Sequence, residues 1–118
     1  MEAPLTATDR LAHVPEPIRS ILTEVKRDLT AFYGDRLQKI ILFGSYARGD
    51  FHDESDIDIM PVIQDDSAQD RRDALSELAY RYMEEYSTKV SIIPATTARY
   101  EKAATFFLMF VQQDGIQL

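Results

Sequence analysis

The sequence predicts an α+β domain in which a small mixed β-sheet carries flanking helices, in the order α-β-β-α-β-α. Short apolar runs of strand length alternate with longer amphipathic segments of helix length. A length of 118 residues fits one domain, and a hydrophobic content of 45% is ordinary for a globular protein. We therefore treat residues 1–118 as a single domain, with residues 1–14 expected to be loosely ordered.

The first half of the chain predicts a helix followed by a strand. A helix is expected from Ile18, because apolar residues recur there at spacings of three and four, and Gly34 suits the position just past its end. These apolar residues are Ile18, Ile21, Leu22, Val25, Leu29, Phe32 and Tyr33. Residues 37–43 end in a continuous apolar run, which is typical of a buried strand.

A second strand is expected over residues 57–63, an acidic turn over 64–70 and a second helix over 71–86. The side chains that this helix is expected to bury are Leu75, Leu78, Ala79, Tyr82 and Met83. A third strand over residues 88–93 is ended by Pro94, because proline has no N–H to donate.

The last segment, residues 98–113, has a helical pattern that Asp114 and Gly115 stop. Within it, residues 105–111 are apolar nearly all round. Core packing is expected to use Phe106 and Phe110, which leaves apolar side chains without a place in the core. We expect this remainder to form a surface for a partner, either a second copy of the chain or another protein.

Composition excludes several classes of function. The chain has no cysteine, which excludes disulfides, cysteine-based zinc sites and thiol catalysis. Its formal net charge of −7 disfavours binding to nucleic acid. No apolar stretch is long enough to span a membrane, and the start does not resemble a signal peptide, so we expect a cytoplasmic protein without a membrane partner.

The segment that follows the first strand predicts a phosphate site. Gly44 breaks the strand, and Ser45 is expected to cap a short helical turn that begins at Tyr46. Such a strand–turn–helix connection directs backbone N–H groups into open space, where they can bind an anion. No Gly-Lys-Ser/Thr string occurs, so this is not a P-loop.

Two aspartates predict a metal site near that turn. Asp56 and Asp58 alternate with Ile57 and Ile59, so in a strand both carboxylates leave the same face while the isoleucines enter the core. Adjacent carboxylates repel one another unless a cation bridges them, and Mg²⁺ suits oxygen ligands that also hold phosphates. Solvated charges on an edge strand would explain the spacing alone, but not the apolar neighbours and the upstream Gly-Ser. A phosphate site facing two carboxylates favours metal-assisted nucleotidyl transfer.

These residues also carry a resemblance. Gly44-Ser45, ten residues and then Asp56-Ile57-Asp58 resembles the motif of the DNA polymerase β-like nucleotidyltransferase superfamily, and Gly-Ser-Tyr-Ala-Arg-Gly-Asp is similar to its minimal nucleotidyltransferase (MNT) branch. The resemblance implies the nucleotidyltransferase fold, ATP as substrate and Mg²⁺ as cofactor. It also implies an antitoxin role, because some MNT proteins transfer AMP to a tyrosine of a partner HEPN-domain toxin.

Carried over to this chain, the resemblance implies that Gly44 and Ser45 hold the triphosphate and that Asp56 and Asp58 are the catalytic, metal-binding residues. Arg48 lies within the matched string, where it could bind a phosphate or fix the loop through a carboxylate such as Asp50. His52 lies in the loop between the two motifs, as a solvated side chain or as a proton shuttle.

The sequence departs from the family at one position. The superfamily carries a third carboxylate on the next strand, and here Ser91 occupies that place, with no Asp or Glu between Ser87 and Tyr100. Catalysis could then be slow, could use a base from the acceptor or could be absent. The alternative function is therefore a non-catalytic antitoxin that binds nucleotide or its partner. A third reading is a nucleotidyltransferase that modifies a small molecule without a partner.

Overall fold

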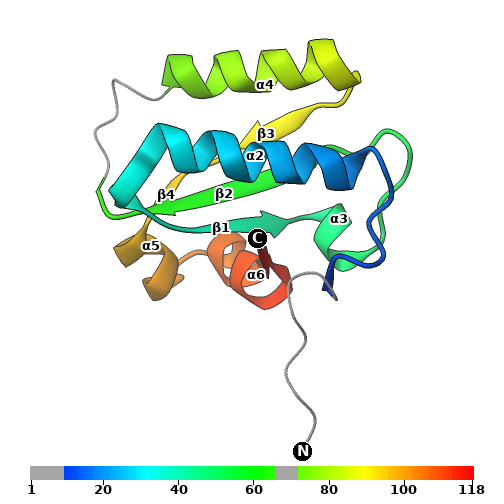
Figure 1. Ribbon diagram of the computed structural model, residues 1–118. Helices are drawn as coiled ribbons and strands as arrows, with labels where there is room; N and C mark the ends of the chain where they lie inside the picture. The colour runs from blue at the N-terminus through cyan, green and yellow to red at the C-terminus, as the bar shows by residue number, and fades with distance from the viewer. Residues whose placement is uncertain (1–9, 66–71) are drawn as a thin grey trace, which may run out of the picture.

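The computed structural model describes residues 10–65 and 72–118, which form a mixed sheet with helices on both faces (Figure 1). The helices are α2 (Ile18–Tyr33), α3 (Ser45–Arg48), α4 (Arg72–Tyr86), α5 (Thr97–Lys102) and α6 (Phe106–Asp114), and a 3₁₀ turn occupies Gly34–Arg36. The strands are β1 (Leu37–Phe43), β2 (Ile57–Ile63), β3 (Val90–Ile92), β4 (Ala95–Thr96) and β5 (Ile116–Gln117). No helix of this described part is long and apolar enough to cross a bilayer.

The sheet has the strand order β3-β2-β1-β5, and β4 also pairs with β2. Strand β1 runs antiparallel to β2 and to β5, whereas β2 runs parallel to β3 and β4. In this register Phe43 lies opposite Asp58, and Asp58 lies opposite Ser91. The sheet is therefore mixed, as the sequence predicts.

Alternation along the strands divides the core between the two faces of the sheet. Ile40 and Leu42 of β1 pack with α2 and α4, while Ile41 and Phe43 pack with Leu108 and other residues on the α6 face. Figure 1 shows α2 and α4 on one side of the strands and α5 and α6 on the other. Phe43, one residue before the predicted phosphate turn, therefore faces α6.

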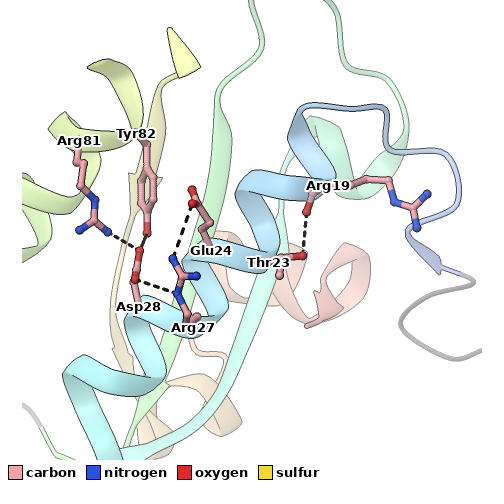
Figure 2. Close-up of polar contacts among 7 residues, drawn as sticks. All are labelled: Arg19, Thr23, Glu24, Arg27, Asp28, Arg81 and Tyr82. Atoms are coloured by element: carbon pink, nitrogen blue, oxygen red, sulfur yellow. Dashed lines mark hydrogen bonds and ion pairs between the residues drawn. The ribbon is translucent and has the colours of Figure 1, made fainter. Parts of the chain in front are cut away.

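A polar cluster joins the two helices of the first face (Figure 2). Asp28 of α2 accepts hydrogen bonds from the Tyr82 hydroxyl at 2.6 Å and from Arg81 at 2.5 Å, both on α4. Arg27 lies beside the same carboxylate at 3.7 Å. Tyr82 is fully buried, so this carboxylate satisfies a hydroxyl that would otherwise lack a partner in the core.

The early elements follow the sequence closely. Helix α2 and strands β1 and β2 have the predicted bounds, and Gly34 follows α2 with a positive φ of 58°. In α4, Leu75 and Tyr82 are buried as predicted, but Met83 is 43% exposed, so its predicted burial is wrong. Most of the predicted acidic turn lies outside the described residues. So does Arg71, the first residue of the predicted second helix.

The predicted helix over residues 98–113 is two helices. Ala103 adopts a left-handed conformation (φ 45°) that ends α5, and the Thr105 side chain accepts a hydrogen bond from the Leu108 N–H to begin α6. The expected burial of Phe106 and Phe110 is also wrong, because they are 79% and 58% exposed. Because α6 lies along the sheet, its buried residues are instead Leu108 and Val111.

Two short strands were not expected from the sequence, and part of the N-terminus packs onto the domain. Strand β4 follows Pro94 and pairs with β2, and β5 pairs with β1 after α6 has ended. Residues 1–9 lie outside the described residues, so the expectation of a loosely ordered start stays a prediction, while residues 13 and 14 contact the rest of the domain. Val14 is 2% exposed, and His13 Nε2 lies 2.6 Å from the Tyr46 carbonyl oxygen.

Candidate active site

The two sequence motifs meet at one edge of the sheet. Because β1 and β2 are antiparallel, the end of β1 lies beside the start of β2, and Gly44 therefore approaches Asp58. A Cβ at Gly44 would collide with the Asp58 carboxylate, and the φ of 77° at this residue is one that L side chains rarely adopt. The backbone conformation therefore favours glycine here, and any side chain would also displace the Asp58 carboxylate.

The turn after β1 differs in one detail from the prediction. Ser45 is the first residue of α3. The cap position is occupied by Gly44, so no side chain caps this helix. The predicted capping role of Ser45 is therefore wrong, since the backbone at Gly44 already turns the chain into the helix. Ser45 lies instead in a cavity wall together with Gly44 and Asp58.

Tyr46 anchors this turn through its buried side chain. Its side chain is 4% exposed and stacks on Phe51 with ring centroids 4.6 Å apart, while its carbonyl contacts His13. Phe51 and His13 are also stacked, at 6.4 Å. The sequence assigned no role to His13, yet the segment that carries it helps to fix α3.

Asp56 and Asp58 lie as the alternation predicts. Both are partly exposed, whereas Ile57 and Ile59 are fully buried. Burial raises the pKa of Asp58, and the neighbouring Asp56 raises it further, while Arg48 and Lys89 act in the opposite direction. The two carboxylates therefore interact electrostatically, and a cation bound between them would relieve their repulsion.

Lys89 is a site residue that motif reasoning did not identify. Its Nζ lies 3.7 Å from Asp56 Oδ2, and its carbonyl oxygen accepts a hydrogen bond from the Ile57 N–H at 2.9 Å. A lysine directly before an expected strand gives no signal in sequence that it faces a carboxylate on the neighbouring strand. Only the parallel register of β2 and β3 brings the two together.

The donor set fits a divalent cation that is shared with a nucleotide. Asp56 and Asp58 carry carboxylate oxygens of the kind that hard cations bind, and Mg²⁺ in proteins commonly takes one or two carboxylates together with substrate phosphates and water. Within residues 10–65 and 72–118 no group of three or more acidic or histidine side chains could hold a metal ion. Ser91 stands opposite Asp58 and contributes a neutral hydroxyl where a third carboxylate would complete such a group.

The roles left open for Arg48 and His52 can be compared with their contacts. Arg48 Nε donates to Asp50 Oδ2 at 3.1 Å, which is the loop-fixing contact, and the same side chain lines two cavities beside Asp58. In the loop, the His52 N–H donates to Ser55 Oγ at 2.8 Å, and its Nδ1 accepts from the Glu54 N–H at 3.2 Å. His52 is exposed and shapes this loop through local hydrogen bonds.

Asp58 lines two hollows in the described part of the chain. A polar one of about 440 Å³ is lined by both aspartates together with Ser45 and Arg48. A larger one of about 630 Å³ is lined by Asp58 and the Gly44 turn on one side and by Phe107 and Phe110 of α6 on the other. The sequence did not predict that α6 contributes to the site. The excess of apolar side chains in α6 was the available signal.

The chain is similar to known proteins in sequence and in fold. The family model described as "Nucleotidyltransferase domain" matches residues 18–113. The "Putative protein adenylyltransferase MJ0141" of Methanocaldococcus jannaschii is 32% identical over 102 residues, which cover 86% of this chain and 98% of that protein. A crystal structure of a toxin–antitoxin with AMP-PNP is 29% identical, with a TM-score of 0.57 over 80% of this chain and 69% of that chain.

A mutant of the toxin–antitoxin MntA-HpeT is similar to the same degree. Its sequence is 29% identical, and its TM-score is 0.55 over 81% of this chain and 70% of that chain. The family match spans α2 to α6 and therefore includes the Gly44 turn, both aspartates and Ser91. With its mixed sheet and its two motifs at one edge, the chain belongs to the nucleotidyltransferase domain family.

Proposed function

We propose that this chain is a Mg²⁺-dependent protein adenylyltransferase that transfers AMP from ATP to a tyrosine hydroxyl of a partner HEPN toxin and so acts as an antitoxin. One observation carries the proposal: Asp56 and Asp58 stand beside the Gly44 turn, and Asp58 and that turn line one cavity. ATP is abundant in the cytoplasm, where we expect this reaction to take place.

Each site residue has a role in the proposal. Gly44 and Ser45 bring backbone N–H groups to the triphosphate, and Arg48, which lines the same cavity, adds a positive charge. Asp56 and Asp58 would hold Mg²⁺, which when bound polarises phosphate oxygens and neutralises charge on the leaving group. Lys89, 3.7 Å from Asp56, orients that carboxylate and balances part of the charge of the pair.

The reaction joins the acceptor oxygen to the α-phosphorus of ATP. As this bond forms, the bond from the α-phosphorus to its bridging oxygen breaks, and pyrophosphate leaves with the electron pair. The hydroxyl proton is released to water, because Ser91 cannot take it up as a carboxylate would. We therefore expect a slow enzyme. A slow rate is sufficient here, because each partner molecule needs to be modified only once.

A protein acceptor is supported by charge and by the relatives. The net charge of −7 disfavours a nucleic-acid acceptor. One relative has a name that describes a protein adenylyltransferase, and the similar solved structures are toxin–antitoxins. The resemblance to the MNT branch names the partner class as a HEPN toxin.

Two positions of radiolabel in ATP test the proposal. The chain and its co-purified partner are incubated with Mg²⁺ and either α- or γ-labelled ATP, and the proteins are separated on a gel. We expect label on the partner from α-labelled ATP alone, and none with Asp56→Asn or Asp58→Asn. Label from γ-labelled ATP would indicate phosphoryl transfer and would contradict the proposal.

Ser91 favours one alternative, a non-catalytic antitoxin that neutralises its partner by forming a complex. This alternative predicts that Asp56→Asn and Asp58→Asn still protect cells from the toxin. The enzyme predicts that protection is lost with both substitutions while the two proteins still associate. Cell survival and co-purification, measured on the same variants, separate the two functions.

A further inference from the structure

Helix α6 exposes more large apolar side chains than its packing requires. Phe106, Phe107, Met109 and Phe110 are 79%, 44%, 51% and 58% exposed. The helix is held on the sheet by Leu108 and Val111, which are buried. A cluster of exposed aromatic side chains on a small domain indicates a binding site.

Two of the four belong to the candidate active site. Phe107 and Phe110 line the cavity of about 630 Å³ whose other wall contains Gly44, Ser45 and Asp58. Phe106 and Met109 do not line it. The cavity thus has a polar wall that suits phosphates and a metal, and an aromatic wall that suits a flat apolar group.

The aromatic wall is fixed in place by its surroundings. Phe107 packs edge-on against Phe43, with ring centroids 5.5 Å apart and planes at 76°. The Thr105 side chain caps the start of α6, and beyond its end Ile116 pairs with Leu42 of β1. Both ends of α6 are therefore anchored, and the Phe107 ring is in place before a ligand binds.

We propose that Phe107 and Phe110 form the subsite for the nucleoside of the donor nucleotide, whose base stacks on these rings while its phosphates lie against Gly44 and Ser45. The inference rests on the proposed function, which places a nucleotide in this cavity. Aromatic rings bind bases through their faces and do not read the hydrogen-bonding edge. The subsite therefore accepts nucleotides as a class and is not selective for adenine.

Calorimetry with two ligands tests the subsite directly. Mg²⁺–ATP and Mg²⁺–tripolyphosphate, which has no nucleoside, are titrated into the wild type and into Phe107→Leu, Phe107→Ala and Phe110→Ala. We expect ATP binding to weaken by about 5- to 100-fold in these variants, the range that base stacking contributes. Tripolyphosphate binding is expected to stay unchanged.

Phe106→Ala is the matched control, because it removes the same side chain from the same helix outside the cavity. It is expected to bind ATP as the wild type does. Phe107→Leu keeps an apolar side chain against Phe43, and a melting curve shows whether each variant folds. An unchanged ATP affinity in folded Phe107→Leu and Phe110→Ala, or an equal loss with tripolyphosphate, would overturn the subsite.

The same samples separate this inference from the proposed function. If ATP affinity depends on Phe107 and Phe110 but no AMP reaches the partner, the subsite stands and the enzyme proposal fails. If AMP is transferred and ATP affinity is insensitive to both residues, the enzyme stands and the subsite fails. Equal loss of partner binding in Phe106→Ala and Phe107→Ala, with ATP affinity intact, would make α6 a protein-docking surface and would also overturn the subsite.

Discussion

Ser91 of β3 lies directly beside Asp58 of β2 in the parallel register of the two strands. Asp58 in turn occupies the space that a side chain at Gly44 would need. One carboxylate therefore connects the Gly44 turn, the candidate metal site and the position that departs from the family. This relationship leads to the first three predictions.

Ser91→Asp is expected to increase the rate of AMP transfer at saturating Mg²⁺. The new carboxylate would stand beside Asp58, where it can accept the proton of the acceptor hydroxyl, so a gain of at least about tenfold is expected. Initial rates of label transfer measure it. Ser91→Asn, similar in size but uncharged, is the control, and an equal gain in both variants would show that charge is not the cause.

Asp58→Asn is expected to stabilise the fold without divalent cations while abolishing transfer. Burial and Asp56 raise the pKa of Asp58 above its unfolded value. The native state therefore holds the proton more tightly, and stability falls as pH rises from about 4 through the folded pKa. Asp58→Asn does not titrate at this position, so its stability does not fall with pH for this reason.

Melting curves in EDTA from pH 4 to 8 provide the measurement. The wild type should lose stability relative to Asp58→Asn as pH rises, leaving the variant a few degrees more stable at neutral pH. Added Mg²⁺ should raise the Tm of the wild type but not the Tm of Asp58→Asn. Asp35→Asn, on an exposed turn, is the control and should match the wild type throughout.

Gly44→Ala and Gly34→Ala separate backbone strain from collision at the site. Both glycines have positive φ, so each substitution should cost about 1 kcal/mol of unfolding free energy through strain. A Cβ added at Gly34 would have nothing within 4 Å, whereas one added at Gly44 would meet Asp58. Gly44→Ala should therefore cost at least about 1 kcal/mol more and also weaken Mg²⁺ binding. Urea unfolding measures both variants, and unfolding curves of Gly44→Ala and Gly34→Ala that coincide would contradict this account.

Tyr82→Phe tests the link between α2 and α4. The variant loses the 2.6 Å hydrogen bond to Asp28, which should reduce unfolding free energy by about 1.5 to 2 kcal/mol. Burial and that hydrogen bond raise the pKa of Tyr82, so folding favours the protonated hydroxyl and wild-type stability falls as pH rises above about 10. The stability of Tyr82→Phe should not fall in this way above about pH 10, because the variant has no hydroxyl to titrate there. Tyr80→Phe, 65% exposed, should behave as the wild type does in both respects.

Local patterns in the sequence were sufficient for the central sheet and for the two motifs. The apolar run of β1 and the alternation around Asp58 determine which faces are buried, and Gly34 marks the end of α2. The register of Ser91 against Asp58 agrees with the position that the family resemblance gives it. These features depend on periodicity over a few residues, which a single sequence contains.

Other features depend on contacts between distant segments. The break at Ala103 and the short strand β5 arise because α6 must return the chain to β1, and no periodicity encodes that requirement. The contact of Lys89 with Asp56 and the aromatic wall of the cavity require the assembled sheet. An apolar helix gives no sign of which of its side chains will remain exposed beside a site.

The intact mass of the partner protein tests the central claim most directly. The toxin is purified after co-expression with the wild-type chain or with the Asp56→Asn/Asp58→Asn double variant, and both samples are measured by mass spectrometry. Transfer despite Ser91 predicts that the toxin gains the mass of one AMP group, at a tyrosine, only with the wild type. A toxin that is bound and neutralised by the wild-type chain but has an unchanged mass would contradict the account.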